Sequence, residues 1–506
     1  MEGVSGTGKQ QHVVAVPLPA QGHLNPLMRF CKLLDAQGFL VTFVNIEPIH
    51  YRIHEVKNVD AHMQAVGNMH SAADEGQEEE AALKKQTLTD EASPNIRCVH
   101  VPIDSLNLAD DFRVSLEASF EAQNSIAPHL EALILQLNCH GPAVTCLISD
   151  FFMTLPTQKI ADKFNIPRIV LYPQSASLQL LVSYAIQGQR TSAKQVVQGL
   201  KQSKTETFCD ASSLPGLPAL LNRDLPEFTH VVDDNVFMWR FMSQTWQQSE
   251  SRAHAMVINS FEELEPTAFK ALSEGFRLPV YGIGPLIEPL DKETSLWKED
   301  EGCIAWLDKQ PPLSVLYISF GSVTLLSKSQ VDEIMAALIS SQQRFLWVFR
   351  RDLVEGITSN SSSSVLDAIM SKCNGKGCVV EWAPQLRVLA HPSVGGFLTH
   401  CGWNSIIEAI GHGKPMLCWP YFSDQPMNAK YVVEEWKIGL QFESSNGLVE
   451  RGEIERVVKA VMEGSEVREN ALRLKEVGCR SLLAGGSSYR NMEILMQSLH
   501  DLQASK

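Results

Sequence analysis

An apolar run of strand length, a helical pattern and a second apolar run follow one another at the start of the chain, and this succession constrains the fold most. HVVAVPL (12–18) and FLVTFV (39–44) are rich in β-branched residues, and NPLMRFCKLLDAQG (25–38) between them has apolar residues at helical spacing. A strand–helix–strand unit of this kind forms the right-handed parallel crossover of an α/β sheet. The chain is therefore predicted to open with a parallel sheet covered by helices.

The predicted first helix carries start and stop signals. Asn25 is expected to cap it, Pro26 suits its first position and Gly38 can end it. This start leaves His23 in the loop after the first strand, at the carboxyl edge where open α/β sheets bind ligands.

The alternation of strands and helices continues in two series. A helix of the second series is expected to open with a capping box formed by Ser327 and Gln330. Two series imply an α/β fold with two domains that face each other. Further strands are expected at 143–149, 166–172 and 255–261 in the first series, and at 313–320, 344–349, 377–382, 394–399 and 415–419 in the second.

Pro, Gly and charged residues between the two series indicate a linker at 286–300. The first domain is then expected at 1–285 and the second at 301–480, with a last helical pattern at 481–506. Residues 71–91 and 359–364 are expected to be solvated loops because they are rich in charge or serine.

Net charge and cysteine content limit the function and the compartment. The net charge of −15 opposes binding to polyanions, so nucleic acid is not an expected partner and any phosphate must be held locally. Eleven scattered cysteines fit a reducing, cytoplasmic location better than a disulfide framework. The chain shows no signal peptide and no apolar run of the roughly 18 residues that a membrane span needs.

Several familiar site patterns are incomplete. GVSGTGK (3–9) matches most of a P-loop, but no strand precedes it and Gln10 replaces the Ser or Thr that binds magnesium. GIGPLI (282–287) begins like a dinucleotide fingerprint, with Ile287 in place of the third glycine. Cysteine and histidine spacing predicts no metal site, and there is no GxSxG elbow of a serine hydrolase.

FLTHCGWNS (397–405) is interpreted as a cradle for an anion. A parallel strand is expected to end near Thr399, Gly402 to permit a sharp turn, and a helix to start near Asn404. Free amides and the positive end of the helix dipole then converge where phosphates bind. His400, Asn404 and Ser405 add donors, so that a diphosphate can be held with few formal charges.

Two nearby residues fit a nucleoside. Glu408 lies one turn beyond Asn404, where a carboxylate can accept hydrogen bonds from two ribose hydroxyls, while Ile406, Ile407 and Ile410 face the core. Trp382 follows a strand, where its indole can stack on a base. The alternatives are an exposed acidic helix residue at 408 and a core residue at 382.

Residues 382–425 resemble the signature box of the plant UDP-dependent glycosyltransferases of family 1. LPAQGHLNP near the start, INSFEELE and YISFGS are also similar to that family, so the resemblance covers most of the chain. It implies the GT-B fold, with two facing Rossmann-like domains, and a last helix at 481–506 that packs back on the first domain. It also implies a monomer with a UDP-sugar co-substrate and no cofactor or metal.

The resemblance assigns roles to residues of the signature box. Gln425 at its end is associated with UDP-glucose, although Gln174 stands where many members carry a Thr or Ser that contacts the sugar. The implied contacts are uracil and nucleoside at Trp382, Ala383 and Gln385, diphosphate at Ser322, His400, Asn404 and Ser405, ribose at Glu408, and sugar at Trp403, Asp424 and Gln425.

The resemblance also implies a catalytic pair, His23 and Asp150. His23 would accept the proton of an acceptor hydroxyl that attacks the anomeric carbon, with inversion of configuration, and Asp150 would orient the imidazole. The expected acceptor is a small lipophilic molecule of phenolic, flavonoid, terpenoid or hormone type. The alternatives are another donor, such as UDP-galactose, UDP-xylose or UDP-rhamnose, and a catalytically silent protein that binds nucleotide sugars.

Overall fold

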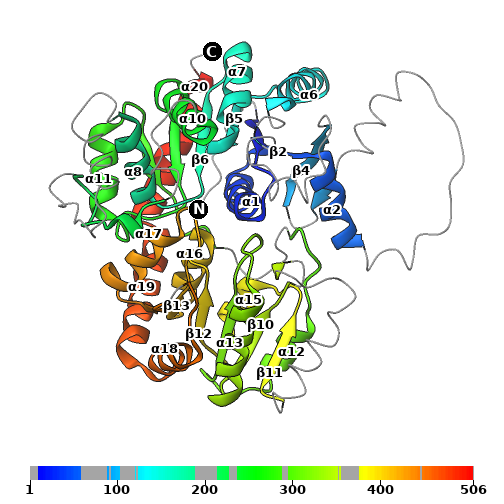
Figure 1. The fold of residues 1–506 in the computed structure, drawn as a ribbon. Helices are drawn as coiled ribbons and strands as arrows, with labels where there is room; N and C mark the ends of the chain where they lie inside the picture. Colours follow the sequence, from blue (N-terminus) through cyan, green and yellow to red (C-terminus); the bar gives the residue numbers. More distant parts are fainter. Residues whose placement is uncertain are drawn as a thin grey trace, which may run out of the picture.

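The protein folds around two separate β-sheets with helices on both faces (Figure 1). Of the described residues, those of the first sheet lie between 12 and 282 and those of the second between 315 and 441. The computed structural model describes residues 10–58, 88–90, 93–102, 120, 124–187, 214–226, 236–287, 295–350, 353–354, 375–444 and 447–504.

The first sheet has eight strands in the order β3-β4-β2-β1-β5-β6-β7-β8, and all neighbours are parallel except β3 and β4. Its central strands are buried on both faces, which explains their continuous apolar runs. The bounds are β1 (His12–Val16), β2 (Leu40–Ile46), β3 (Leu88–Asp90), β4 (Ser93–Val101), β5 (Cys146–Asp150), β6 (Arg168–Tyr172), β7 (Ala255–Ile258) and β8 (Val280–Gly282).

Helices of the first half follow the strands as crossovers. The 3-10 turn at Phe151–Met153 comes directly after β5, and a second one lies at Asn222–Asp224. The helices are α1 (Gln21–Ala36), α2 (Glu47–Asn58), α6 (Ile126–His140), α7 (Thr154–Phe164), α8 (Ala176–Gln187), α10 (Phe237–Arg252) and α11 (Pro266–Gly275).

The second sheet has six parallel strands in the order β11-β10-β9-β12-β13-β14. Its strands are β9 (Val315–Ser319), β10 (Arg344–Val348), β11 (Gly377–Val380), β12 (Val394–Thr399), β13 (Met416–Cys418) and β14 (Gly439–Gln441). Its helices are α12 (Gly302–Leu307), α13 (Lys328–Ser340), α15 (Gln385–Ala390), α16 (Trp403–His412), α17 (Gln425–Lys430), a π-helical turn (Tyr431–Glu435), α18 (Arg451–Glu463) and α19 (Ser465–Leu482).

The last helix, α20 (Ser487–Ala504), returns to the first half, where Figure 1 shows it in red. Leu495, Met496 and Leu499 belong to the apolar core of the first sheet. Ser498 hydrogen-bonds to His254 at 2.6 Å, which fixes the helix next to β7.

The predicted α/β class and the two parallel series are confirmed. Each predicted strand is present, and the last helical pattern at 481–506 is α20. Four strands were not predicted: the nine-residue strand β4 and the three-residue strands β3, β8 and β14. Within the described stretches, no helix is both long enough and apolar enough to cross a membrane.

Helix α1 begins earlier than predicted, at Gln21. Its N-cap residue is Ala20, which makes no side-chain capping hydrogen bond. Asn25 therefore lies inside the helix and His23 in its first turn, whereas the end at Gly38, with φ of 85°, is as predicted. Pro26 lies in the second turn of α1, so the helical hydrogen bond to the Gly22 carbonyl is missing, and that carbonyl accepts from Asn404 instead.

Two other expectations also need correction. Ser327 caps α13, but the side chain of Gln330 bonds both backbone groups of Val449 instead of closing a capping box. The expected loop at 71–91 ends in the short strand β3 (Leu88–Asp90), which pairs antiparallel with β4. The rest of that loop and the one at 359–364 lie outside the described residues.

Candidate active site

A cavity of about 840 Å³ of non-atom space, including its open mouth, lies where α1 of the first half meets the strand ends of the second. Gln21, Gly22 and Asn25 contribute from α1, and Ser319 from the end of β9. All eight residues predicted to bind the nucleotide line it: Ser322, Trp382, Ala383, Gln385, His400, Asn404, Ser405 and Glu408.

Helix α16 starts at this cavity, and among the described residues no side chain hydrogen-bonds to its first amides. Two other helix starts are occupied by side chains: Glu265 accepts from the amides of Ala176 and Ser177 at 2.9 and 2.8 Å at the start of α8, and Ser327 accepts at the start of α13, whereas α1 and α7 are uncapped like α16. The amides and dipole of α16 are therefore available to an anion in the cavity.

His400 fills the space beside this helix start. A Cβ on Gly402 would lie 2.5 Å from its Nε2 atom, and one on Gly321 would lie 2.7 Å away. Burial lowers the pKa of His400 to about 4, which the Ser319 backbone offsets only in part, and Nδ1 is buried with no hydrogen-bond partner among the described residues. The ring is therefore neutral at pH 7 and can donate a hydrogen bond to a phosphate oxygen.

The turn before α16 differs from the prediction in one respect. Gly402 has an ordinary φ of −62°, and Cys401 takes the left-handed conformation with φ of 65°. A glycine is needed at 402 because the His400 ring leaves no room for a side chain, and the sharp backbone turn is made one residue earlier.

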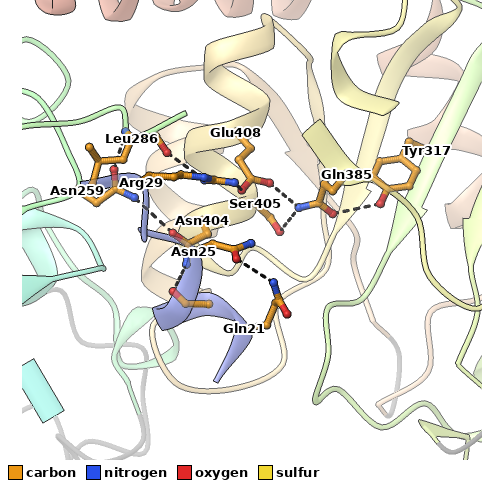
Figure 2. A network of polar contacts seen from close by, with 11 residues as sticks. Gln21, Asn25, Arg29, Asn259, Leu286, Tyr317, Gln385, Asn404, Ser405 and Glu408 are labelled. Atoms are coloured by element: carbon orange, nitrogen blue, oxygen red, sulfur yellow. Dashed lines mark hydrogen bonds and ion pairs between the residues drawn. The ribbon is translucent and has the colours of Figure 1, made fainter. Parts of the chain in front are cut away.

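Glu408 is only 4% exposed, so it is not a surface residue. Its Oε1 atom accepts from Arg29 at 2.9 Å and its Oε2 atom accepts from Gln385 Nε2 at 2.8 Å (Figure 2). Gln385 in turn donates to Ser405 and accepts from the Tyr317 hydroxyl at 3.1 Å. Ile406, Ile407 and Ile410 are fully buried, as predicted.

Asn404 lies in the cavity, but its side chain also joins the two halves (Figure 2). Its Oδ1 atom accepts from Asn259 at the end of β7, and its Nδ2 atom donates to the carbonyl of Gly22. That carbonyl is available because Pro26, four residues later in α1, has no N–H to donate. Trp403 is 3% exposed and donates from Nε1 to the Asn259 carbonyl at 2.7 Å.

Trp382 is partly buried and lines the cavity, as a base-stacking residue must. Trp297 packs against it with ring centroids 4.4 Å apart and ring planes tilted by 35°, and the Arg350 guanidinium lies 4.6 Å from the centre of Trp297. Arg350 also donates to the carbonyl of Ser322 at 3.1 Å. Trp297 and Arg350 thus connect the expected uracil platform, Trp382, with the expected phosphate-binding loop at Ser322.

His23 and Asp150 form a close pair in the first half. Nδ1 of His23 lies 2.7 Å from Oδ2 of Asp150, whose other oxygen accepts from the Phe152 amide at 2.9 Å. Asp150 is fully buried, whereas the His23 side chain is 18% exposed. The imidazole is therefore oriented through Nδ1, and Nε2 is its second functional atom.

Of the residues expected to face the sugar, Trp403 lines the cavity, whereas Asp424 and Gln425 do not, and Asp424 lies near His23. Asp424 is 7% exposed, and burial raises its pKa against the effects of Asn428 and of nearby His23. The carbonyl oxygen of Gln425 accepts from the amides of Tyr421 and Phe422. Gln174 is half-buried and does not line the cavity.

Sequence analysis missed residues that act across the seam between the halves, notably Arg29, Asn259 and Trp297. Asn259 was part of INSFEELE and Trp297 of the predicted linker, but neither carries a pattern that reveals a partner far away in sequence. Arg29 is buried in the structure, where an arginine needs partners, but the sequence analysis did not predict its burial.

Two family models match the chain. One, described as "UDP-glucoronosyl and UDP-glucosyl transferase", matches residues 294–479, and one described as "Glycosyltransferase, N-terminal domain" matches residues 9–74.

Similar proteins span nearly the whole chain. Linamarin synthase 1 of Manihot esculenta is 33% identical over 97% of each chain. 7-Deoxyloganetin glucosyltransferase of Catharanthus roseus is 32% identical over 98% of each, and (R)-mandelonitrile beta-glucosyltransferase of Prunus dulcis is 32% identical over 96% of each.

Solved structures share the arrangement. A Polygonum tinctorium UDP-glucosyltransferase that glucosylates indoxyl, in complex with 3,4-dichloroaniline, has a TM-score of 0.75 and 27% identity over 99% of this chain and 100% of that one. Phytolacca americana UGT2 with UDP-2-fluoro-glucose and pterostilbene has a TM-score of 0.73 and 26% identity over 97% and 100%. The two-sheet fold is thus the GT-B fold.

Proposed function

Because the chain belongs to the plant family 1 UDP-glycosyltransferases and is therefore a hexosyltransferase, we propose that it transfers glucose from UDP-glucose to a hydroxyl of a small lipophilic acceptor, with inversion. The names of the relatives support glucose, since two of them are glucosyltransferases. Those names also point to small acceptors such as mandelonitrile and 7-deoxyloganetin.

The observation that carries the proposal is the uncapped start of α16 at a cavity that all eight expected nucleotide residues line. In our proposal the diphosphate binds the first amides of α16 together with His400, Ser405 and Ser322. Uracil stacks on Trp382, and the ribose hydroxyls donate to Glu408. The leaving diphosphate gains negative charge as the glycosidic bond breaks, and dipole and amides fixed in advance stabilise that charge.

His23 is proposed as the general base. Its Nε2 atom accepts the proton of the acceptor hydroxyl while the oxygen attacks the anomeric carbon from the face opposite to UDP, which inverts the configuration. The imidazolium that forms is stabilised by Asp150, which is held in place by the Phe152 amide. We further propose that Asp424 and Gln425 bind hydroxyls of the sugar, because Asp424 lies near His23 and Gln425 follows it at the start of α17.

The domains are proposed to follow the two sheets: an acceptor-binding half at 1–285, a linker at 286–300, a UDP-sugar-binding half at 301–480, and the last helix at 481–506 on the first half. A monomer in the cytoplasm is part of the same proposal. The buried contacts of α20 with the first sheet support the position of the last helix.

The proposal is tested with purified protein, a panel of phenolic, flavonoid, terpenoid and cyanohydrin acceptors, and UDP-glucose, UDP-galactose, UDP-xylose and UDP-rhamnose. Mass spectrometry measures the glycosides, and calorimetry measures UDP binding. His23→Ala is expected to lower kcat by about 10²- to 10⁴-fold and to leave the Kd for UDP unchanged, because it removes the base and not the cradle.

The matched control is His140→Ala, an exposed histidine at the end of α6 that should leave both quantities unchanged. UDP binding without turnover of any acceptor would favour the silent binding protein. A His23→Ala variant as active as the wild type would refute the assigned base.

A further inference from the structure

Arg29 joins three parts of the chain that are far apart in sequence. It lies on α1, is 4% exposed, and donates from Nη2 to Glu408 on α16 and from Nη1 to the carbonyl of Leu286, at 2.9 Å in both cases (Figure 2). Leu286 lies at the start of the linker, and its amide donates to Asn259. One guanidinium therefore connects the acceptor-side half, the linker and the donor-side half.

Stability alone is a poor explanation for this contact. A buried ion pair must offset the cost of removing two charges from water, and apolar replacements often stabilise a fold equally well. Carboxylate oxygens can each accept more than one hydrogen bond, and Glu408, which is held by Arg29 and Gln385, lines the cavity, so a ligand there can reach its carboxylate.

We propose that Arg29 is a positioning residue for the donor: it fixes and charge-balances Glu408 so that this carboxylate accepts the two ribose hydroxyls. The inference rests on the proposed function, which places the ribose at Glu408. It goes beyond that function because it makes recognition of the ribose depend on a residue of the opposite half. Binding of the donor then depends on the contact between α1 and α16 that docks the two halves.

The experiment compares two ligands, UDP and 2′,3′-dideoxy-UDP, with calorimetry as the readout. The wild type is expected to prefer UDP because of its hydroxyls. Arg29→Met is expected to weaken UDP binding about tenfold or more, as expected when a hydrogen bond to a charged group is lost, and to change the Kd for the dideoxy nucleotide much less. The preference for UDP should therefore shrink. Arg29→Lys keeps the positive charge but lacks the several fixed N–H donors of the guanidinium, so it should retain part of the preference for UDP.

The matched control is Lys32→Met, which removes a cation from the same helix one turn later and should keep the full preference. An unchanged preference in Arg29→Met would overturn the inference, and so would an equal loss of both ligands, which would mark Arg29 as merely structural. If Arg29→Met does not fold, the preference for UDP over 2′,3′-dideoxy-UDP is measured with Arg29→Lys instead. A reduced preference then supports the inference, and an unchanged preference overturns it. A wild type that does not bind UDP would instead refute the proposed function.

Discussion

Replacing Gly402 with alanine tests the proposed phosphate cradle with a single methyl group. Gly402 has a φ of −62°, so alanine adds no backbone strain, in contrast to Gly321 with φ of 75°. The new Cβ would lie 2.5 Å from Nε2 of His400 and 3.1 Å from its Cε1, so the ring must move by several tenths of an ångström. Overpacking of this kind costs about 1–3 kcal/mol.

The cost is expected to appear in donor binding, because His400 and the first amides of α16 are displaced together. We expect calorimetry to show a Kd for UDP that is about 10- to 100-fold higher. At about 1.4 kcal/mol per factor of ten, this rise lies within the overpacking cost of about 1–3 kcal/mol. Gly452→Ala in α18 is the matched control, since its Cβ meets nothing within 4 Å, and it should leave the Kd unchanged. Unchanged UDP affinity and thermal stability in Gly402→Ala would refute the cradle as described.

Two further predictions concern Trp382 and the pH dependence of stability. Trp382→Ala removes the proposed uracil platform and should weaken UDP binding by about 1–3 kcal/mol, while Trp382→Phe should retain part of the affinity. If calorimetry gives the same Kd for the wild type and both variants, the proposed stacking is contradicted. Burial lowers the pKa of His12, His400 and His412 to about 4 in the folded protein. Between pH 6.5 and about 4 the unfolded chain therefore binds more protons than the folded chain. As a result, the free energy of unfolding falls as the pH falls through that window. His412→Gln should make this slope shallower by up to about 1.4 kcal/mol per pH unit in urea unfolding, and an unaltered slope would show that His412 does not contribute.

Local patterns were sufficient for the strands and for much of the cradle. The buried parallel strands are continuous apolar runs, and FLTHCGWNS contains a strand end, a turn and a helix start within nine residues. The start of α1 was misplaced because Asn25 and Pro26 imitate a helix start. In the structure Pro26 lies in the second turn, where its missing amide frees the Gly22 carbonyl for Asn404.

The contacts across the seam could not be predicted. Arg29 and Glu408 are 379 positions apart, and Asn259 and Asn404 are 145 apart. No periodicity or spacing specifies such pairs, because they depend on how two independently patterned halves are docked. The short edge strands β8 and β14 were missed for a related reason: with three residues each, they contain too few positions to show a pattern.

The return of α20 to the first sheet also affects when the protein can fold during synthesis. Domains usually fold as units, the N-terminal one first, while the chain is still on the ribosome. In this protein Leu495, Met496 and Leu499 complete the core of the first half, so that half remains incomplete until α20 has left the ribosomal tunnel. The first half, although translated first, can reach its final form only after the second half has been translated.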